Sequence, residues 1–141
     1  MEEDPEVSES ESNNNEEQLV YKNYTEQDLA DLTAFYFAFD KSELSELAVN
    51  SLSYHAELIQ DKIAEDPEFL LTIEGHTDER GTAEYNIALG LRRAAAVSRF
   101  LRVNGVPANN INTVSYGEER PANLGSNEEA WAENRRADLV Y

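Results

Sequence analysis

IEGHTDERGT, residues 73–82, joins a predicted strand to a predicted helix through a tight loop. The strand becomes polar at its end, and Gly75 and Gly81 allow the chain to turn sharply there. Thr82 is a typical N-cap residue, so we expect a helix to begin directly after it. Asp78 would then lie at the mouth of the loop.

The helix predicted after this loop runs to about Val103, because Gly105 supplies a C-terminal cap. At about 100° per residue, one side of this helix carries an apolar stripe that we expect to pack in the core. Arg93 falls at the margin of the stripe, on the same side as Asn86 and facing the loop. The stripe consists of Ile87, Gly90, Ala94, Val97 and Leu101, and the arginines expected to face water are Arg92, Arg99 and Arg102.

An arginine at the margin of a core needs hydrogen-bond acceptors. One interpretation is an internal pair between Arg93 and Asp78, Glu74 or a backbone carbonyl. The other is that Arg93 keeps donors for a ligand carboxylate, which it would bind through two parallel hydrogen bonds. Asp78 would then take the ammonium of the same ligand, and the two residues would form a receptor for the head group of an amino acid.

Helices and strands are predicted to alternate along the rest of the chain. The strand at 35–39 is apolar on both faces, which is typical of a strand in the interior of a sheet. Alternation of this kind predicts a two-layer α/β sandwich with helices packed on a sheet. The other expected elements are a helix turn at 25–29 capped by Thr25, a helix from the N-cap Ser42 to about Glu65, strands at 69–73 and 111–116, a short helix opened by a capping box at Ser126–Glu129, and a strand at 136–141.

The first part of the chain differs from the rest in composition. The 141 residues carry a net charge of −18, and residues 1–31 hold eleven acidic side chains against one lysine. Residues 1–18 contain almost no apolar side chains, so they cannot bury enough surface to offset the conformational entropy lost on folding. We therefore expect residues 1–30 to form a disordered acidic tail and residues 31–141 to form one folded domain.

The composition argues against several classes of function. An acidic chain lacks the clustered lysines and arginines that bind nucleic acids or anionic membrane surfaces. The absence of cysteine excludes a thiolate nucleophile and a cysteine-based metal site. The sequence also contains no Ser-His-Asp signature and no phosphate-binding glycine loop. We therefore expect neither an enzyme nor a cofactor.

The two histidines are predicted to be structural rather than metal-binding. His76 and Asp78 could supply two ligands, but no third ligand lies at a supporting spacing, and His55 falls in the first long helix. No stretch approaches the ~18 apolar residues of a membrane span, and the acidic start of the chain is unlike a secretory signal. These features indicate either a cytoplasmic protein or a processed form.

Several motifs, in this order, resemble the OmpA-like peptidoglycan-binding domain over about residues 35–141. They are FAFDK at 37–41, EGHTDERGT at 74–82, YNIALG at 85–90, RRA at 92–94, VSYGEE at 114–119, PA at 121–122 and NRRA at 134–137. The resemblance implies a mixed four-stranded sheet covered by helices. It is strongest to the outer-membrane lipoproteins that carry this domain.

The resemblance also implies a function and a site. It indicates a non-catalytic domain that binds the stem peptide of peptidoglycan through meso-diaminopimelate. The ligand-contacting aspartate of the family's His-Thr-Asp loop falls on Asp78, and its contacting arginine falls on Arg93. The remaining positions that contact or border the ligand fall on Phe39, Asp40, Tyr85, Asn86 and Leu89.

Similar lipoproteins are periplasmic, are anchored in the outer membrane by a lipidated cysteine, and bind the periplasmic propeller protein of the Tol system. The function implied is a tether between the outer membrane and the cell wall. The alternative is a protein–protein adaptor of the Tol system in which wall binding is secondary, and a wall hydrolase is a remote third. No cysteine occurs among the 141 residues, so they do not include a lipidation site.

Overall fold

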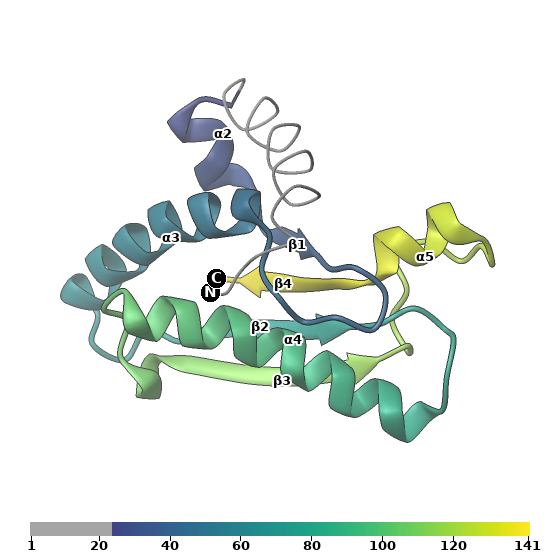
Figure 1. Cartoon of the computed structure of the whole chain (residues 1–141). Coiled ribbons are helices and arrows are strands. Elements are labelled where there is room, and N and C mark those ends of the chain that lie inside the picture. Colours follow the sequence, from purple (N-terminus) through teal and green to yellow (C-terminus); the bar gives the residue numbers. More distant parts are fainter. Residues whose placement is uncertain (1–23) are drawn as a thin grey trace, which may run out of the picture.

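The computed structural model describes residues 24–141. Its four strands form one mixed sheet in the order β1-β4-β2-β3, with β2 parallel to β3 and β4 antiparallel to both of its neighbours. The two-layer arrangement of helices and a mixed sheet is therefore confirmed (Figure 1). The elements are α2 (Glu26–Asp31), β1 (Ala34–Tyr36), α3 (Glu46–Glu65), β2 (Leu71–His76), α4 (Ala83–Val103), η1 (Ala108–Asn110), β3 (Ile111–Gly117), α5 (Glu128–Asn134) and β4 (Arg136–Val140).

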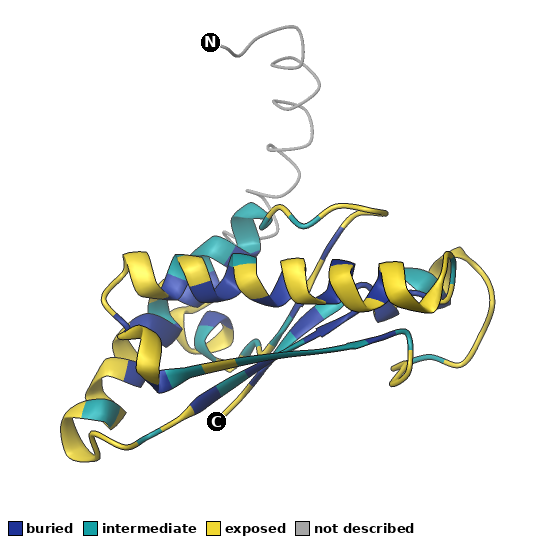
Figure 2. Ribbon diagram, turned by 90° about the horizontal axis from the view of Figure 1, so that it is seen from below, coloured by how far each residue is buried: buried dark blue, intermediate teal, exposed yellow. Residues whose placement is uncertain are grey.

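The core lies between the two long helices and one face of the sheet. Side chains alternate between the two faces of a strand, so Leu71 and Ile73 on β2 point to the same face and are both fully buried. In α4, buried residues lie along the side that faces the strands and exposed residues along the outer side (Figure 2). None of the helices in residues 24–141 is both long and apolar enough to cross a membrane. The apolar core comprises Phe35, Phe37, Ala48, Leu52, Ala56, Ile59, Leu71, Ile73, Ala94, Val97, Leu101, Val106, Ala137 and Leu139.

The helix α2 packs against α3. The side chain of Thr25 accepts a hydrogen bond from the backbone of Asp28, and the side chain of Asp28 accepts one from the backbone of Thr25, which is the predicted capping box. Leu29 is buried, and its carbonyl accepts a hydrogen bond from Ser51 on α3. The folded part of the chain thus includes residues that the sequence placed in the acidic tail. The rest of that predicted tail, residues 1–23, lies outside the described residues.

The prediction of an interior strand at 35–39 is wrong. β1 is an edge strand that pairs only with β4, and Tyr36 is 53% exposed while Phe35 and Phe37 are buried. An antiparallel strand can have one face packed on the core and the other in solvent, so β1 accommodates an exposed aromatic ring between two buried ones. The chain leaves the sheet after Tyr36, and Asp40 adopts a positive φ of 58° in the turn that follows.

Two predicted helix starts are shifted toward the C-terminus. The N-cap of α3 is Ser45 and not Ser42, and the N-cap of α5 is Asn127 and not Ser126. In the first case, residues 38–44 form a loop instead of a helical turn, because the carbonyls of Ala38 and Lys41 are needed as acceptors for Arg93 on α4. Tertiary hydrogen bonds thus override a local capping signal.

Close backbone contact sets the position of α4 on the sheet. A Cβ atom on Gly75 of β2 would lie 1.7 Å from the carbonyl oxygen of Gly90 on α4. A Cβ atom on Gly90 would lie 2.3 Å from Oγ of Ser115 on β3. Only glycines allow this approach, which keeps the first turns of α4 directly beside the loop that follows β2.

Candidate functional site

A pocket of about 260 Å3 lies where the loop after β2, the loop after β1 and the first turns of α4 meet. Capping by Thr82, whose side chain accepts a hydrogen bond from the backbone N–H of Tyr85, confirms the predicted start of α4 and orients its first turn toward the pocket. All seven residues predicted for the site line this one pocket. The lining residues are Phe39, Asp40, Thr77, Asp78, Arg80, Gly81, Tyr85, Asn86, Leu89 and Arg93.

Arg93 forms the floor of the pocket and has no exposed surface. Its Nε donates to the carbonyl of Lys41 at 2.9 Å, Nη1 to that of His76 at 2.9 Å and Nη2 to that of Ala38 at 3.2 Å. The structure thus shows the internal hydrogen bonds of the first interpretation, and their acceptors are backbone carbonyls. A guanidinium has five N–H groups, so two remain after these three bonds.

Among residues 24–141, no carboxylate lies within hydrogen-bonding distance of the Arg93 guanidinium. Burial lowers the pKa of Arg93 to about 10, which leaves the guanidinium protonated at neutral pH. Its planar group lies 5.3 Å from the ring centroid of Phe37, a cation–π contact that does not neutralise it. A buried cation that is held only by neutral acceptors favours a second, anionic partner.

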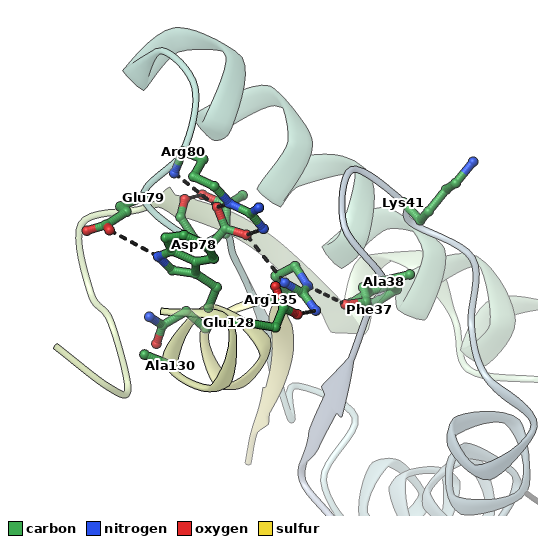
Figure 3. A network of polar contacts seen from close by, with 12 residues as sticks. Phe37, Ala38, Lys41, Asp78, Glu79, Arg80, Glu128, Ala130 and Arg135 are labelled. Atoms are coloured by element: carbon green, nitrogen blue, oxygen red, sulfur yellow. Dashed lines mark hydrogen bonds and ion pairs between the residues drawn. The ribbon is translucent and has the colours of Figure 1, made fainter. Parts of the chain in front are cut away.

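Asp78 lies on the loop side of the pocket and is paired with two arginines (Figure 3). Nη2 of Arg80 is 2.8 Å from Oδ2 of Asp78, and Nη1 of Arg135 is 3.6 Å from the same oxygen. Oδ1 accepts hydrogen bonds from the backbone N–H and from Nε of Arg80. Burial acts to raise the pKa of Asp78, but the hydrogen bonds and charge of Arg80 lower it overall, so the carboxylate is ionised at neutral pH.

Arg80 is held between two aromatic rings. Its guanidinium carbon lies 4.2 Å from the centroid of Phe39 and 4.1 Å from that of Trp131. The indole nitrogen of Trp131 donates to Glu79 at 3.0 Å, which fixes the ring next to the loop. The side chain of Arg80 nevertheless remains 33% exposed, in contrast to that of Arg93. The pocket therefore has one buried guanidinium and one that reaches solvent.

The remaining predicted residues hold the loop or form the rim. Asn86 is buried and donates to the carbonyl of Arg80 at 3.0 Å and to the Oε1 atom of Glu118 at 2.6 Å, so it ties the loop to α4. Tyr85 is 44% exposed, and its hydroxyl donates a short hydrogen bond to Asp40. Phe39 is 55% exposed and Leu89 is buried, so an apolar surface continues from the rim into the pocket.

The sequence did not single out Arg80, Arg135 or Trp131. Arg80 follows Asp78 by two residues, a spacing at which an aspartate can accept a hydrogen bond from the backbone, and this local signal was available. Arg135 comes from the other end of the chain, between α5 and β4, and no local pattern indicates that it reaches Asp78. Trp131 lies on α5, and its contact with Arg80 likewise depends on the tertiary fold.

His55 is a satisfied buried histidine, as the sequence predicted. One ring nitrogen is 2.6 Å from the carbonyl of Leu32 and the other is 2.7 Å from the hydroxyl of Tyr141. Desolvation lowers the pKa of His55, so the ring is neutral. His76 differs, because neither of its ring nitrogens has a hydrogen-bond partner in the part of the chain that the structure describes.

Comparison with known proteins identifies relatives of this domain. A model described as the OmpA family matches residues 36–135. A peptidoglycan-associated lipoprotein of Pasteurella multocida is 46% identical over 123 residues, which cover 86% of this chain and 79% of the relative. One from Haemophilus influenzae is 50% identical, covering 75% and 67%, and one from Pseudomonas aeruginosa is 46% identical, covering 77% and 61%.

Solved structures agree with these matches. The crystal structure of the peptidoglycan-associated lipoprotein from Burkholderia pseudomallei has a TM-score of 0.75 and 42% sequence identity, covering 80% of this chain and 92% of that one. The C-terminal domain of Helicobacter pylori MotB has a TM-score of 0.66 at 20% identity, covering 77% and 83%, and it supports the fold alone.

Proposed function

The chain belongs to the OmpA family, and from this premise we propose that it binds peptidoglycan without catalysis, through meso-diaminopimelate of the stem peptide, and so tethers the outer membrane to the cell wall. Its relatives at 46–50% identity are named peptidoglycan-associated lipoproteins, which supports peptidoglycan as the bound polymer and the cell envelope as the location. The charged groups of the pocket support diaminopimelate as the ligand.

The observation that carries the proposal is the buried, carbonyl-bound guanidinium of Arg93 at the floor of an accessible pocket. A ligand carboxylate would accept hydrogen bonds from its two remaining N–H groups and would offset its charge in a site of low dielectric constant. A charge-assisted hydrogen bond of this kind contributes about 1.5–3 kcal/mol.

Asp78 supplies the opposite charge in the same pocket. Its two oxygens accept three hydrogen bonds from Arg80, which leaves acceptor capacity for an ammonium group. Diaminopimelate carries an ammonium and a carboxylate on one carbon at the end of its side chain. The corresponding lysine lacks that carboxylate, so it would bury the charge of Arg93 without pairing it, and a site built for a polar group discriminates strongly against an analogue without it.

Co-sedimentation with purified sacculi tests this function. We expect the parent chain to sediment with diaminopimelate-type sacculi and not with lysine-type sacculi. Asp78→Ala and Arg93→Lys should abolish sedimentation, because the first removes the ammonium partner and the second removes the two-bond geometry for the carboxylate. Glu79→Gln is the matched control, since Glu79 neighbours Asp78 but bonds to Trp131 outside the pocket.

Normal co-sedimentation of both folded variants would refute the site. Equal binding to the two kinds of sacculi would refute diaminopimelate as the determinant while leaving peptidoglycan binding in place. Release of soluble muropeptides from the sacculi would refute the absence of catalysis. The three results are distinct, so each part of the proposal can fail separately.

The same surface suits a protein partner, and we propose the periplasmic propeller protein of the Tol system for this role. Phe39 and Tyr85 at the rim are 55% and 44% exposed, and exposed aromatic rings are frequent anchors in protein interfaces. Titration of the labelled chain with the propeller protein should perturb the amides of residues 77–82. A soluble diaminopimelate stem peptide should then compete with it, and independent binding of the two would place the partner elsewhere.

We place the domain in the periplasm, at the inner side of the outer membrane. This location follows from the proposed ligand, because the peptidoglycan layer lies in that compartment. The 141 residues contain no cysteine, so a lipid attached to an N-terminal cysteine would lie outside them. Immunodetection of the native protein in washed outer-membrane fractions tests the location.

A further inference from the structure

A second cluster of ligand-like side chains lies on the opposite face of the sheet from the helices. Glu74 and His76 are two residues apart on β2, so their side chains share a face, and Asp138 on β4 is the register partner of Glu74. One ligand atom from each of the three residues lies within 4.8 Å of the others. Asp138 comes from the C-terminal strand, which explains why the spacing of residues in the sequence indicated no third ligand.

His76 is the unusual member of this cluster. It is 2% exposed, and both of its ring nitrogens lack a hydrogen-bond partner, although a buried imidazole ordinarily has one. Its Nε2 atom points between the two carboxylates, 3.7 Å from Oε1 of Glu74 and 3.5 Å from Oδ2 of Asp138. These distances are too long for hydrogen bonds, so the geometry leaves the nitrogen without a partner at the centre of an acidic pair.

We propose that Glu74, His76 and Asp138 bind a divalent transition-metal ion, with zinc as the best fit. Zinc takes imidazole nitrogen and carboxylate oxygen at about 2.0–2.2 Å, which places neighbouring ligand atoms of a tetrahedral site about 3.3–3.5 Å apart. The two distances from Nε2 of His76 are within a few tenths of an ångström of that spacing. Water would complete the four ligands, since Glu74 and Asp138 keep about a quarter of their side-chain surface exposed.

The surroundings of the cluster fit a metal ligand set. Nε of Arg136 donates to Oδ2 of Asp138 at 3.0 Å, the kind of outer hydrogen bond that orients a metal-binding carboxylate. The ring of His76 is stacked on Tyr116 with centroids 5.6 Å apart, which fixes its plane. Burial, assisted by Arg136 and Arg120, lowers the pKa of His76 to about 4, so the imidazole is in the neutral form that metals bind.

The charges around the site predict its strength. Burial raises the pKa of Asp138 in spite of its bond to Arg136, so this carboxylate gains from a further cation. Arg136 pairs with Asp138, and the positive charges of Arg136 and Arg120 also act on His76, so both guanidinium groups oppose the binding of a metal cation. A site with three protein ligands and two neighbouring guanidinium groups should bind zinc with moderate affinity.

Zinc titration of the full 141-residue chain tests the site. Calorimetry should show one zinc ion bound per chain, and long-range 15N–1H correlation spectra should show a shift of the Nε2 signal of His76. Asp138→Asn and Glu74→Gln should each weaken zinc binding about tenfold or more with the amide spectrum otherwise unchanged. Glu57→Gln, an exposed position on α3, should bind zinc as the parent does, and magnesium should not shift the His76 signal.

Zinc binding that leaves the His76 signals unmoved would overturn the proposal, because the ion would then be held by other carboxylates of this acidic chain. Unchanged affinity in both Asp138→Asn and Glu74→Gln would overturn it as well. If either variant fails to fold, the Nε2 shift of the parent chain alone decides. The test does not involve peptidoglycan, so its outcome is independent of the proposed function.

Discussion

The two sides of the pocket hold their charges in opposite ways. On the helix side, Arg93 is fully buried and is bonded to three neutral carbonyls. On the loop side, Asp78 is paired with Arg80 and Arg135, so its charge is already compensated. Arg93 therefore stabilises the fold and still lacks an anionic partner, whereas Asp78 can exchange one cationic partner for another.

The contrast has a physical basis in exposure. Arg93 on α4 bonds to β2 and to the loop after β1, so it cannot move without breaking the contacts among these three elements. Arg80 stacks between two rings but its side chain is 33% exposed, so water can replace its hydrogen bonds to Asp78 when a ligand ammonium approaches. Substitutions should therefore affect stability on the helix side and mainly binding on the loop side.

The largest effect is expected for Arg93→Ala. This substitution leaves the carbonyls of Ala38, Lys41 and His76 without their donor and removes the packing of the side chain against Phe37, so the free energy of unfolding should fall by about 3 kcal/mol or more. Urea unfolding followed by circular dichroism measures it. A free energy of unfolding within about 0.5 kcal/mol of the parent value would show that Arg93 does not stabilise the fold.

A smaller loss of stability is expected for Asp78→Ala, about 1–2 kcal/mol, because it leaves Arg135 buried with one ionic partner fewer. The same urea experiment compares it with Arg93→Ala. The loop-side variant should keep its fold yet lose binding to diaminopimelate-type sacculi. If Asp78→Ala costs as much as Arg93→Ala, the proposed contrast between the two sides is wrong.

The pH dependence of binding should reflect the charge pairing on the loop side. Arg80 lowers the pKa of Asp78, and a depressed carboxylate pKa means that the charged form persists until the pH falls through that lowered value. Binding of a stem peptide should therefore survive below the ordinary aspartate pKa of 3.8. Arg80→Ala should raise the pKa of Asp78, so binding should be lost at a higher pH than in the parent.

Fluorescence titration of a labelled stem peptide across the acidic range measures this shift. Glu79→Gln serves as the control, since it changes a neighbouring carboxylate without removing a hydrogen bond to Asp78. If Arg80→Ala and the parent lose binding at the same pH, a group other than Asp78 controls binding at low pH.

The smallest effect is expected for Tyr85→Phe. The change removes the hydrogen bond that the hydroxyl of Tyr85 donates to Asp40 and the long one, at 3.5 Å, that it accepts from Arg92, but it leaves the ring in place. Because Tyr85 is 44% exposed, the free energy of unfolding should change by no more than about 0.5 kcal/mol. Sacculus binding should weaken only slightly, and a complete loss would assign the hydroxyl a direct contact with the ligand.

Local signals predicted much of the fold correctly. The capping of α4 by Thr82 and of α2 by Thr25 with Asp28 depends on side chains within three residues, and both caps are confirmed. The end of α4 at Asn104 and Gly105 is confirmed for the same reason. The start of α3 was misplaced, because the distant donor Arg93 binds the carbonyls of the loop before it. The start of α5 was misplaced by one residue, because Asn127 competes with its neighbour Ser126 as the cap.

Loop position and helical periodicity, which are local properties of the chain, predicted that Asp78, Asn86 and Arg93 lie together, and the family resemblance added Phe39, Asp40, Tyr85 and Leu89. The pairing of the charges, in contrast, depends on the three-dimensional fold. Arg93 bonds to residues of two other segments, and Asp78 meets Arg135 from the far end of the chain. A buried charge takes its partners from whatever the fold brings within hydrogen-bonding distance, and spacing along the chain does not encode that distance.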